Sequence, residues 1–290
     1  MLNIGNDSAP FNRLRELLVN LKYLQSLEKD SLVDIGTFNF VTPFSITPLA
    51  GEINRNNLRI DLDNSYCKVI CFPKGIENVD DLDQYNNKTY LPIFHADLEN
   101  DFRFLDQVAS SYVKLIIRNM NSTDQAFMSN LSVNALASMV GELMDNIKQH
   151  SKAKNAYIFG QYYPKDNSLE FCIYDDGEGI YSSLLKAGRP VKDNLDALKQ
   201  VIESHLSAKD VEGEEKRGTG IKNTRKLINN DIVRGDFVIA SGNAGYIESN
   251  SVEELKQYYG LTTAQIYGTL VVCRLSKPLS KINMYDYVTN

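Results

Sequence analysis

Glu142-Leu-Met-Asp-Asn146, Asp175-Asp-Gly177-Glu-Gly179 and Gly218-Thr-Gly220 are the three stretches on which the interpretation of this sequence depends. The first stretch, Glu142–Asn146, lies in a segment whose apolar residues recur at the spacing of an α-helix. The second follows the strand-like run Phe171–Tyr174, and the third precedes another helical pattern. Polar helix faces and glycine turns are common, so each stretch alone is a weak signal. Their occurrence in this order on one chain makes the combination specific.

Hydrophobic spacing around these stretches predicts an α/β protein, built as an α+β sandwich. Helical patterns cover about 11–27, 101–118, 124–150 and 221–229. Strand patterns cover about 156–161, 169–174, 236–241 and 270–274.

The helical stretch places polar side chains one turn apart. Glu142, Asn146 and His150 are separated by four residues each, so α-helical spacing puts them on one face. An amide oxygen such as that of Asn146 suits Mg²⁺, and a carboxylate can orient or deprotonate a nucleophile. A solvated polar helix face is the alternative. The apolar stripe on another face of this helix consists of Leu136, Val140, Leu143 and Ile147.

The first glycine stretch leaves the end of a strand. Asp175 can accept a hydrogen bond from the amino group of a base at this point. Gly177 and Gly179 permit positive φ and a close approach of the backbone. A tight turn that uses aspartate and glycine for geometry alone is the alternative.

The second glycine stretch opens a helix. Gly218 and Gly220 flank Thr219 and leave backbone N–H groups free for an anionic phosphate. Lys216 and Arg217 add positive charge at the same place. A flexible loop with a helix cap is the alternative.

At these spacings, Glu-x-x-Asp-Asn, Asp-x-Gly-x-Gly and Gly-x-Gly resemble the N, G1 and G2 boxes of the GHKL ATPase superfamily, which includes gyrase and the histidine kinases. The resemblance covers about 101–276. It implies a Bergerat-type ATP-binding domain, with a mixed sheet and helices on one face, and a lid at about 181–217. The charged end of that lid is expected to be mobile without nucleotide.

The resemblance also implies roles for individual residues. Glu142 would be the catalytic general base, Asn146 the Mg²⁺ ligand and Asp175 the adenine-binding residue. The cofactors would be ATP or ADP, with Mg²⁺. The residues expected to bind them are Asn146, His150, Asp175, Gly177, Gly179, Lys216, Arg217, Gly218, Thr219, Gly220 and Thr269.

The chain before residue 101 is expected to form an N-terminal helix (1–30) and a small module (31–100), followed by the ATP-binding domain (101–290). The run Asp34–Ile53 followed by Lys68–Pro73 resembles STAS-like modules, in which a strand ends in a Pro-Phe turn that starts a helix. Strands are expected at about 33–38 and 68–72, and an exposed linker at 78–100. An α/β extension that packs on the ATPase sheet is the alternative.

Composition excludes some functions. The 290 residues carry a formal net charge of −6, which argues against a nucleic-acid-binding face as the main function. No apolar run is long enough to span a bilayer, and the N-terminus lacks the pattern of a secretory signal. Four separated cysteines and three histidines predict free thiols rather than a zinc site. The expected location is cytoplasmic.

The two resemblances imply a regulatory protein with slow ATPase activity or an anti-sigma-kinase-like serine/threonine kinase activity, acting on a protein partner. A self-phosphorylating histidine kinase is not expected, because His95 lacks the acidic residue that usually follows the phosphoacceptor. The alternatives are a nucleotide-sensing module without turnover and a partner-dependent effector ATPase. A homodimer is left open, and neither nucleic acid nor membrane is expected as a partner.

Overall fold

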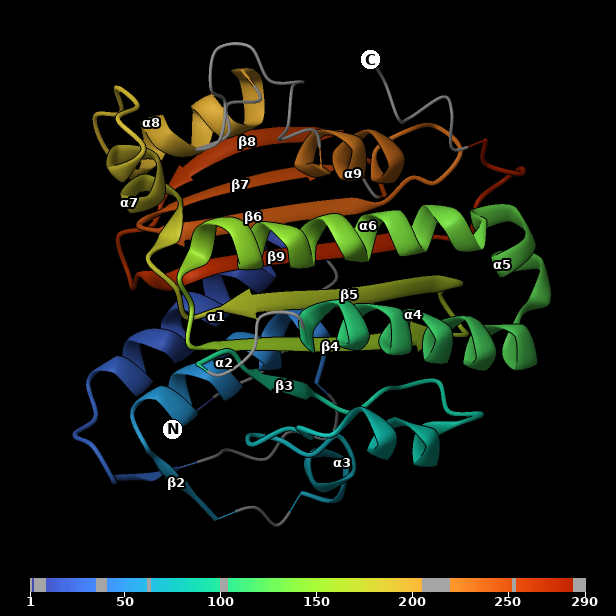
Figure 1. The fold of residues 1–290 in the computed structure, drawn as a ribbon, viewed down its shortest axis with the longest axis horizontal. Helices are drawn as coiled ribbons and strands as arrows, with labels where there is room; N and C mark the ends of the chain where they lie inside the picture. Colours follow the sequence, from blue (N-terminus) through green and yellow to red (C-terminus); the bar gives the residue numbers. More distant parts are fainter. Residues whose placement is uncertain are drawn as a thin grey trace.

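The computed structural model describes residues 2, 9–34, 41–61, 64–99, 104–204, 220–251 and 254–283. Its centre is a seven-stranded sheet in the order β3-β4-β5-β9-β6-β7-β8, and every neighbouring pair is antiparallel (Figure 1). The strands are β3 (Phe94–Asp97), β4 (Asn155–Tyr163), β5 (Ser168–Asp175), β6 (Asp236–Gly242), β7 (Ala244–Ser249), β8 (Leu255–Gly260) and β9 (Ile266–Ser276).

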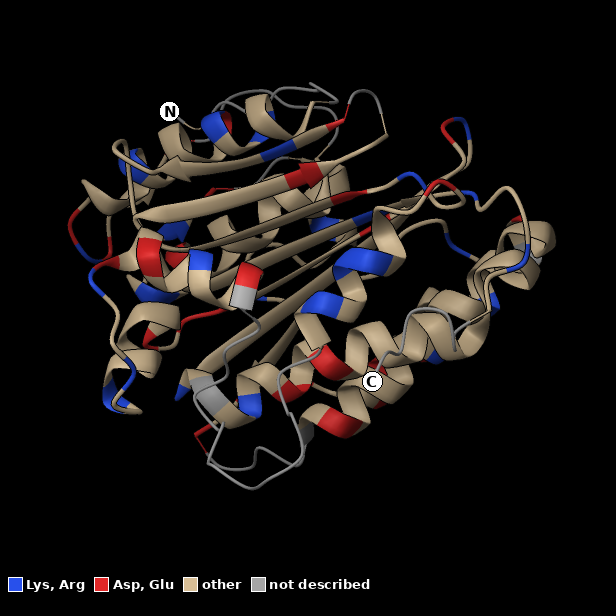
Figure 2. Ribbon diagram, turned by 90° about the horizontal axis from the view of Figure 1, so that it is seen from above, with Lys and Arg blue, Asp and Glu red and all other residues tan. Residues whose placement is uncertain are grey.

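Helices cover both faces of this sheet (Figures 1 and 2). One layer comprises α4 (Phe104–Thr123), α5 (Gln125–Leu131), α6 (Val133–Asn146) and α9 (Gly220–Ile228). The other contains α1 (Pro10–Gln25) and α2 (Pro43–Arg55). The expectation of a mixed sheet was wrong, because the described neighbouring strands are all antiparallel. The described helices of the predicted ATP-binding domain lie on one face, as expected, and the second cover comes from the N-terminal helices α1 and α2. The physical reason is that β5 is buried along its whole length, so both of its faces need an apolar cover.

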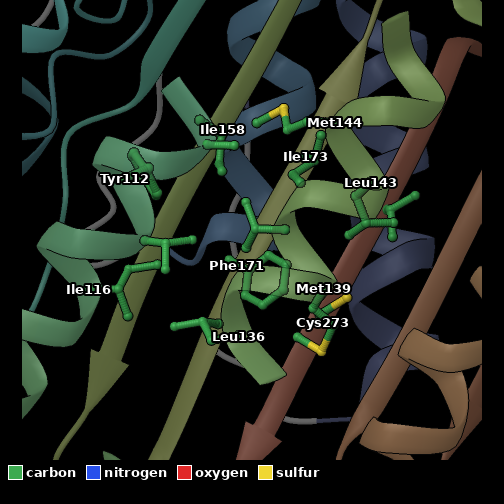
Figure 3. Close-up of a cluster of buried hydrophobic side chains, with 14 of the residues drawn as sticks. Tyr112, Ile116, Leu136, Met139, Leu143, Met144, Ile158, Phe171, Ile173 and Cys273 are labelled. Carbon is green, nitrogen blue, oxygen red and sulfur yellow. The ribbon is translucent and has the colours of Figure 1, made fainter. Parts of the chain in front are cut away.

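The two apolar layers meet alternate residues of the same strands. Phe171 and Ile173 pack toward α4 and α6, whereas Cys172 and Tyr174 pack with the N-terminal helices. Figure 3 shows the first of these clusters, in which side chains of two helices interlock with side chains of three strands. Its labelled members are Tyr112, Ile116, Leu136, Met139, Leu143, Met144, Ile158, Phe171, Ile173 and Cys273.

The described part of 31–100 differs from its predicted elements. A short helix, α3 (Ser65–Val69), capped by the side chain of Asn64, occupies the start of the strand expected at 68–72. The expected linker is ordered instead, as the 3₁₀ helix η1 (Val79–Tyr85) and the edge strand β3. Its aspartates face water while three apolar side chains of η1 are buried. A parallel pair of two-residue strands, β1 (Leu32–Val33) and β2 (Arg59–Ile60), completes this region.

Position 34 is the last described residue of the strand expected at 33–38, and 35–40 lie outside the described residues. The domain boundaries stay a prediction. The helix α2 nevertheless packs on β4 and β5 of the large sheet. A Cβ on Gly51 of α2 would overlap the ring of Tyr174, so this packing is close.

The predicted helices and strands around the three stretches are present. The helical pattern at 124–150 divides into α5 and α6 at Ser132, whose φ is 70°, and ends in the π-helical turn η2 (Ile147–Ser151). The strands β7 and β8 were not predicted. No helix of the described chain is long and apolar enough to cross a membrane.

A buried ion pair joins the N-terminal helices to the sheet. Both oxygens of Glu170, in β5, accept hydrogen bonds from Arg13 of α1, at 2.6 and 2.7 Å. Glu170 also accepts the N–H of Phe44 at 3.0 Å, and Arg13 donates to Thr42 at 2.8 Å. Burial alone would raise the pKa of Glu170, but the Arg13 guanidinium holds it below its ordinary value. Three elements thus meet at one carboxylate.

We expect Glu170→Gln to lower the free energy of unfolding by about 3–5 kcal/mol, because the guanidinium of Arg13 would stay buried without its counter-charge. Urea unfolding monitored by circular dichroism measures the change. Asp83→Asn is the control, since its pair with Arg118 is exposed and should contribute less than about 1 kcal/mol. Equal effects of the two variants would contradict the anchoring role of Glu170.

Candidate functional site

The described parts of the three sequence stretches are linked through α6: Gly220 lies against Glu142, and the turn after Asp175 contacts η2, which directly follows α6. The last turns of α6 carry Glu142 and Asn146, β5 ends at Asp175, and α9 begins at Gly220. A Cβ on Gly220 would lie 2.5 Å from Oε2 of Glu142 and 2.9 Å from its Cβ. The first residue of α9 therefore lies directly against the carboxylate-bearing face of α6, although the two residues are far apart in sequence.

The turn after β5 is held by its own backbone and by η2. The N–H of Gly177 donates to Oδ1 of Asp175 at 2.9 Å, and the N–H of Glu178 donates to the carbonyl of Ser151 at 2.7 Å. A Cβ on Gly177 would overlap that carbonyl, so a glycine is required there. Gly179, with φ of 75°, then starts α7 (Gly179–Lys186).

Strands β6 and β9 close the same turn from the other side. Ser241 accepts a hydrogen bond from the N–H of Ile180 at 3.0 Å and donates to the carbonyl of Gly268 at 2.7 Å. Gly268 has φ of 76°, and a Cβ there would overlap the carbonyl of Asp175. Sequence reasoning missed Ser241, and it placed Thr269 in the site but not the adjacent Gly268.

Asp175 has a buried carboxyl group at the centre of this turn. It is 4% exposed, and burial raises its pKa to about 7. Hydrogen bonds from the N–H groups of Gly177 and Thr269 oppose the rise, and the neighbouring carboxylate of Asp176 adds to it. The carboxylate of Asp175 can therefore accept a hydrogen bond from a ligand at a place where water has little access.

Glu142 and Asn146 are half-buried, and within the described chain neither side chain has a hydrogen-bond or ion-pair partner. Burial raises the pKa of Glu142, and the nearby carboxylate of Asp145 raises it further. Two polar side chains on one helix face are thus available to a ligand. The described residues contain no group of three or more His, Cys, Asp or Glu side chains that could hold a metal ion.

His150 lies in the wider turn η2, which begins at Ile147, so the α-helical spacing that linked it to Asn146 ends at Asn146. Its side chain lies outside the described part, as do Lys216, Arg217, Gly218 and Thr219. The first half of the expected lid is helical, formed by α7, α8 (Asn194–Lys199) and the π-helical turn η3 (Gln200–Ser204). The charged end of the lid is not described.

A second aspartate fixes the position of the turn. Asp176 accepts the N–H groups of Lys154 and Asn155 at 2.9 and 2.8 Å, and the side-chain amide of Asn155 at 2.7 Å. Asn155 in turn contacts Nε2 of His95 at 2.8 Å, and Nδ1 of His95 lies 3.1 Å from Glu77. This chain of contacts connects the turn with the edge strand β3.

We expect Gly268→Ala to destabilise the protein more than Gly188→Ala. Both glycines have φ near 75°, and a left-handed conformation costs an alanine about 1–2 kcal/mol. Only Gly268 is crowded, and overpacking there should add about 1–3 kcal/mol. Thermal and urea unfolding of both variants measure the difference. Equal losses would show that the close approach of β9 to Asp175 is absent in solution.

No protein-family model and no curated protein matches this chain.

Proposed function

We propose that this protein binds ATP or ADP with Mg²⁺ where α6, the turn after β5 and the start of α9 meet, in a Bergerat-type arrangement similar to that of the GHKL ATPases. It is a regulatory protein that hydrolyses ATP slowly or transfers its phosphoryl group to a serine or threonine of a protein partner. The observation that carries the proposal is the contact between Gly220 and Glu142 on α6, the helix whose continuation η2 contacts the Asp175 turn.

The turn after β5 supports the base end of the site. Asp175 offers a buried acceptor for the exocyclic amino group of adenine, and Thr269 borders it through its backbone. Gly177, Gly179 and Gly268 bring three backbone segments together at a distance that a side chain would prevent. A flat ring bound beside this turn would contact main chain and a single carboxylate, which gives selectivity for an amino-purine.

The helices support the phosphate end. The start of α9 presents the positive end of a helix dipole beside Glu142, which suits a phosphate. Asn146 provides an uncharged oxygen, and Mg²⁺ in nucleotide sites commonly takes one or two protein ligands together with phosphates and water. The residues present therefore fit a Mg²⁺–nucleotide complex.

Glu142 is the residue that would perform chemistry. Bound ATP with Mg²⁺ supplies an electrophilic γ-phosphoryl group. The carboxylate of Glu142 would accept the proton of the attacking water or hydroxyl, and its raised pKa makes it a stronger base than an exposed glutamate. Asn146, one turn further along α6, would orient the phosphate end.

We expect Asp175→Asn to weaken ATP binding by at least about tenfold, because an amide cannot replace the buried carboxylate acceptor without presenting N–H groups to the adenine amino group. Isothermal titration with Mg²⁺ and ATP measures the affinity. Wild-type affinity should also rise between about pH 6 and 8, as Asp175 ionises with a pKa of about 7, and this rise should be absent in the variant.

The control for Asp175→Asn is Asp166→Asn, in the exposed turn between β4 and β5. Because the amide relieves a buried charge, Asp175→Asn should stay folded. Unchanged ATP affinity in a folded Asp175→Asn would refute the assignment of the base end.

We expect Glu142→Ala to retain ATP binding but to reduce phosphate release or transfer by at least about 100-fold, because the general base is removed. Single-turnover assays with γ-labelled ATP, with and without candidate partners, measure this effect. Glu28→Ala, an exposed glutamate after α1, is the control. If wild type binds ATP but never turns it over, the enzymatic part is wrong and a nucleotide-sensing module is the function that remains.

A further inference from the structure

A second concave surface lies outside the proposed nucleotide site. It is a groove of about 810 Å³ between α9, η3 and the strands β7 and β8. No residue assigned to the nucleotide site lines it. Its size is that of a ligand-binding cleft, so its chemistry decides what it can hold.

The groove is basic although the protein as a whole is acidic. Four of its lining residues are cations, and two, Glu203 and Glu248, are anions. Both carboxylates are engaged within the wall. Glu248 accepts from Arg225 at 2.7 Å and lies 3.2 Å from Lys256, and Glu203 is hydrogen-bonded to Tyr258. The lining therefore carries an excess of positive charge.

Lys222 is the cation in this groove that is most available to a ligand. It is half-buried in the first turns of α9, and no described residue forms an ion pair or hydrogen bond with it. Lys226, one turn further on, is exposed on the same helix. Lys256, on β8, stands across the groove with its side chain 58% exposed. Ammonium groups thus flank the groove from two elements.

The floor of the groove is aromatic and fixed. The rings of Tyr246 and Tyr258 lie with their centroids 4.6 Å apart, and Arg225 lies 5.0 Å from the centroid of Tyr246. Arg225 also donates to the carbonyl of Ile202 at 2.8 Å and to the hydroxyl of Tyr246 at 3.0 Å. These contacts hold the floor in place, so a partner can dock without first ordering it.

One wall residue has unused hydrogen-bonding capacity. Both polar side-chain atoms of Asn229 are shielded from solvent and have no hydrogen-bond partner among the described residues. An unsatisfied buried amide is unfavourable. A side-chain amide pairs well with the N–H and C=O groups of an extended peptide, whereas a bare anion offers acceptors only.

We infer that this groove binds an acidic segment of a partner protein. Carboxylates of the segment would pair with Lys222 and Lys256, its apolar atoms would rest on the two tyrosines, and its backbone would pair with Asn229. The inference names the chemistry of the regulatory partner in the proposed function, but the groove stands apart from the nucleotide site and needs no ATP.

The test uses the full-length protein and a fluorescein-labelled glutamate–serine repeat peptide, followed by fluorescence anisotropy without nucleotide. A glutamine–serine repeat peptide is the uncharged probe. We expect the acidic peptide to bind and the uncharged one not to bind. Lys226→Glu combined with Lys256→Glu should weaken binding by at least about tenfold, because it reverses charge on both sides of the groove.

Lys29→Glu combined with Lys165→Glu is the matched control, since it changes the net charge equally at exposed sites outside the groove. Loss of binding only in the groove variant supports the inference. No binding of the acidic peptide at low salt, equal losses in both variants, or binding only to phosphatidylserine vesicles or inorganic phosphate would overturn it. ATP titration of the same variants reports on the nucleotide site separately.

Discussion

The buried carboxylate of Glu170 constrains the rest of the structure. It is the third residue of β5, and it must meet Arg13 and the start of α2 because an isolated charge cannot remain in the core. The same strand ends five residues later at Asp175. The N-terminal helices therefore form the second cover of the sheet and also hold the strand from which the candidate site extends.

The sequence predicted most elements near the three stretches, because each has a strong local signal. The apolar run before Asp175 reads as a buried strand, and α6 has a clear stripe. Prediction failed where local and tertiary preferences compete. Lys68–Phe72 contains β-branched residues, yet the helix that Asn64 caps starts at Ser65 and extends into this run as far as Val69. The sequences of β7 and β8 contain glycines, tyrosines and charged residues without a clear strand pattern. They are strands because they pair with the rest of the sheet.

The candidate site was predictable in its polar residues and not in its supports. Glu142, Asp175 and Gly220 belong to recognisable patterns. The residues that hold the turn after Asp175 against β6 and β9, Ser241 and Gly268, act through hydrogen bonds and close backbone approach between strands distant in sequence. Such contacts produce no periodic pattern in the amino-acid sequence from which they could be predicted. Residues 205–219 carry four further predicted positions, which the structure does not describe.

The two ends of the site rest on different supports. Strand ends hold Asp175, whereas α9 meets Glu142 at its first residue and lines the basic groove with its later turns. Under the proposed function, one helix then borders two ligands. Any difference in the position of α9 between ATP- and ADP-bound forms becomes a coupling free energy between the sites. Thermodynamic reciprocity requires the docked partner to change nucleotide affinity by the same factor as nucleotide changes partner affinity.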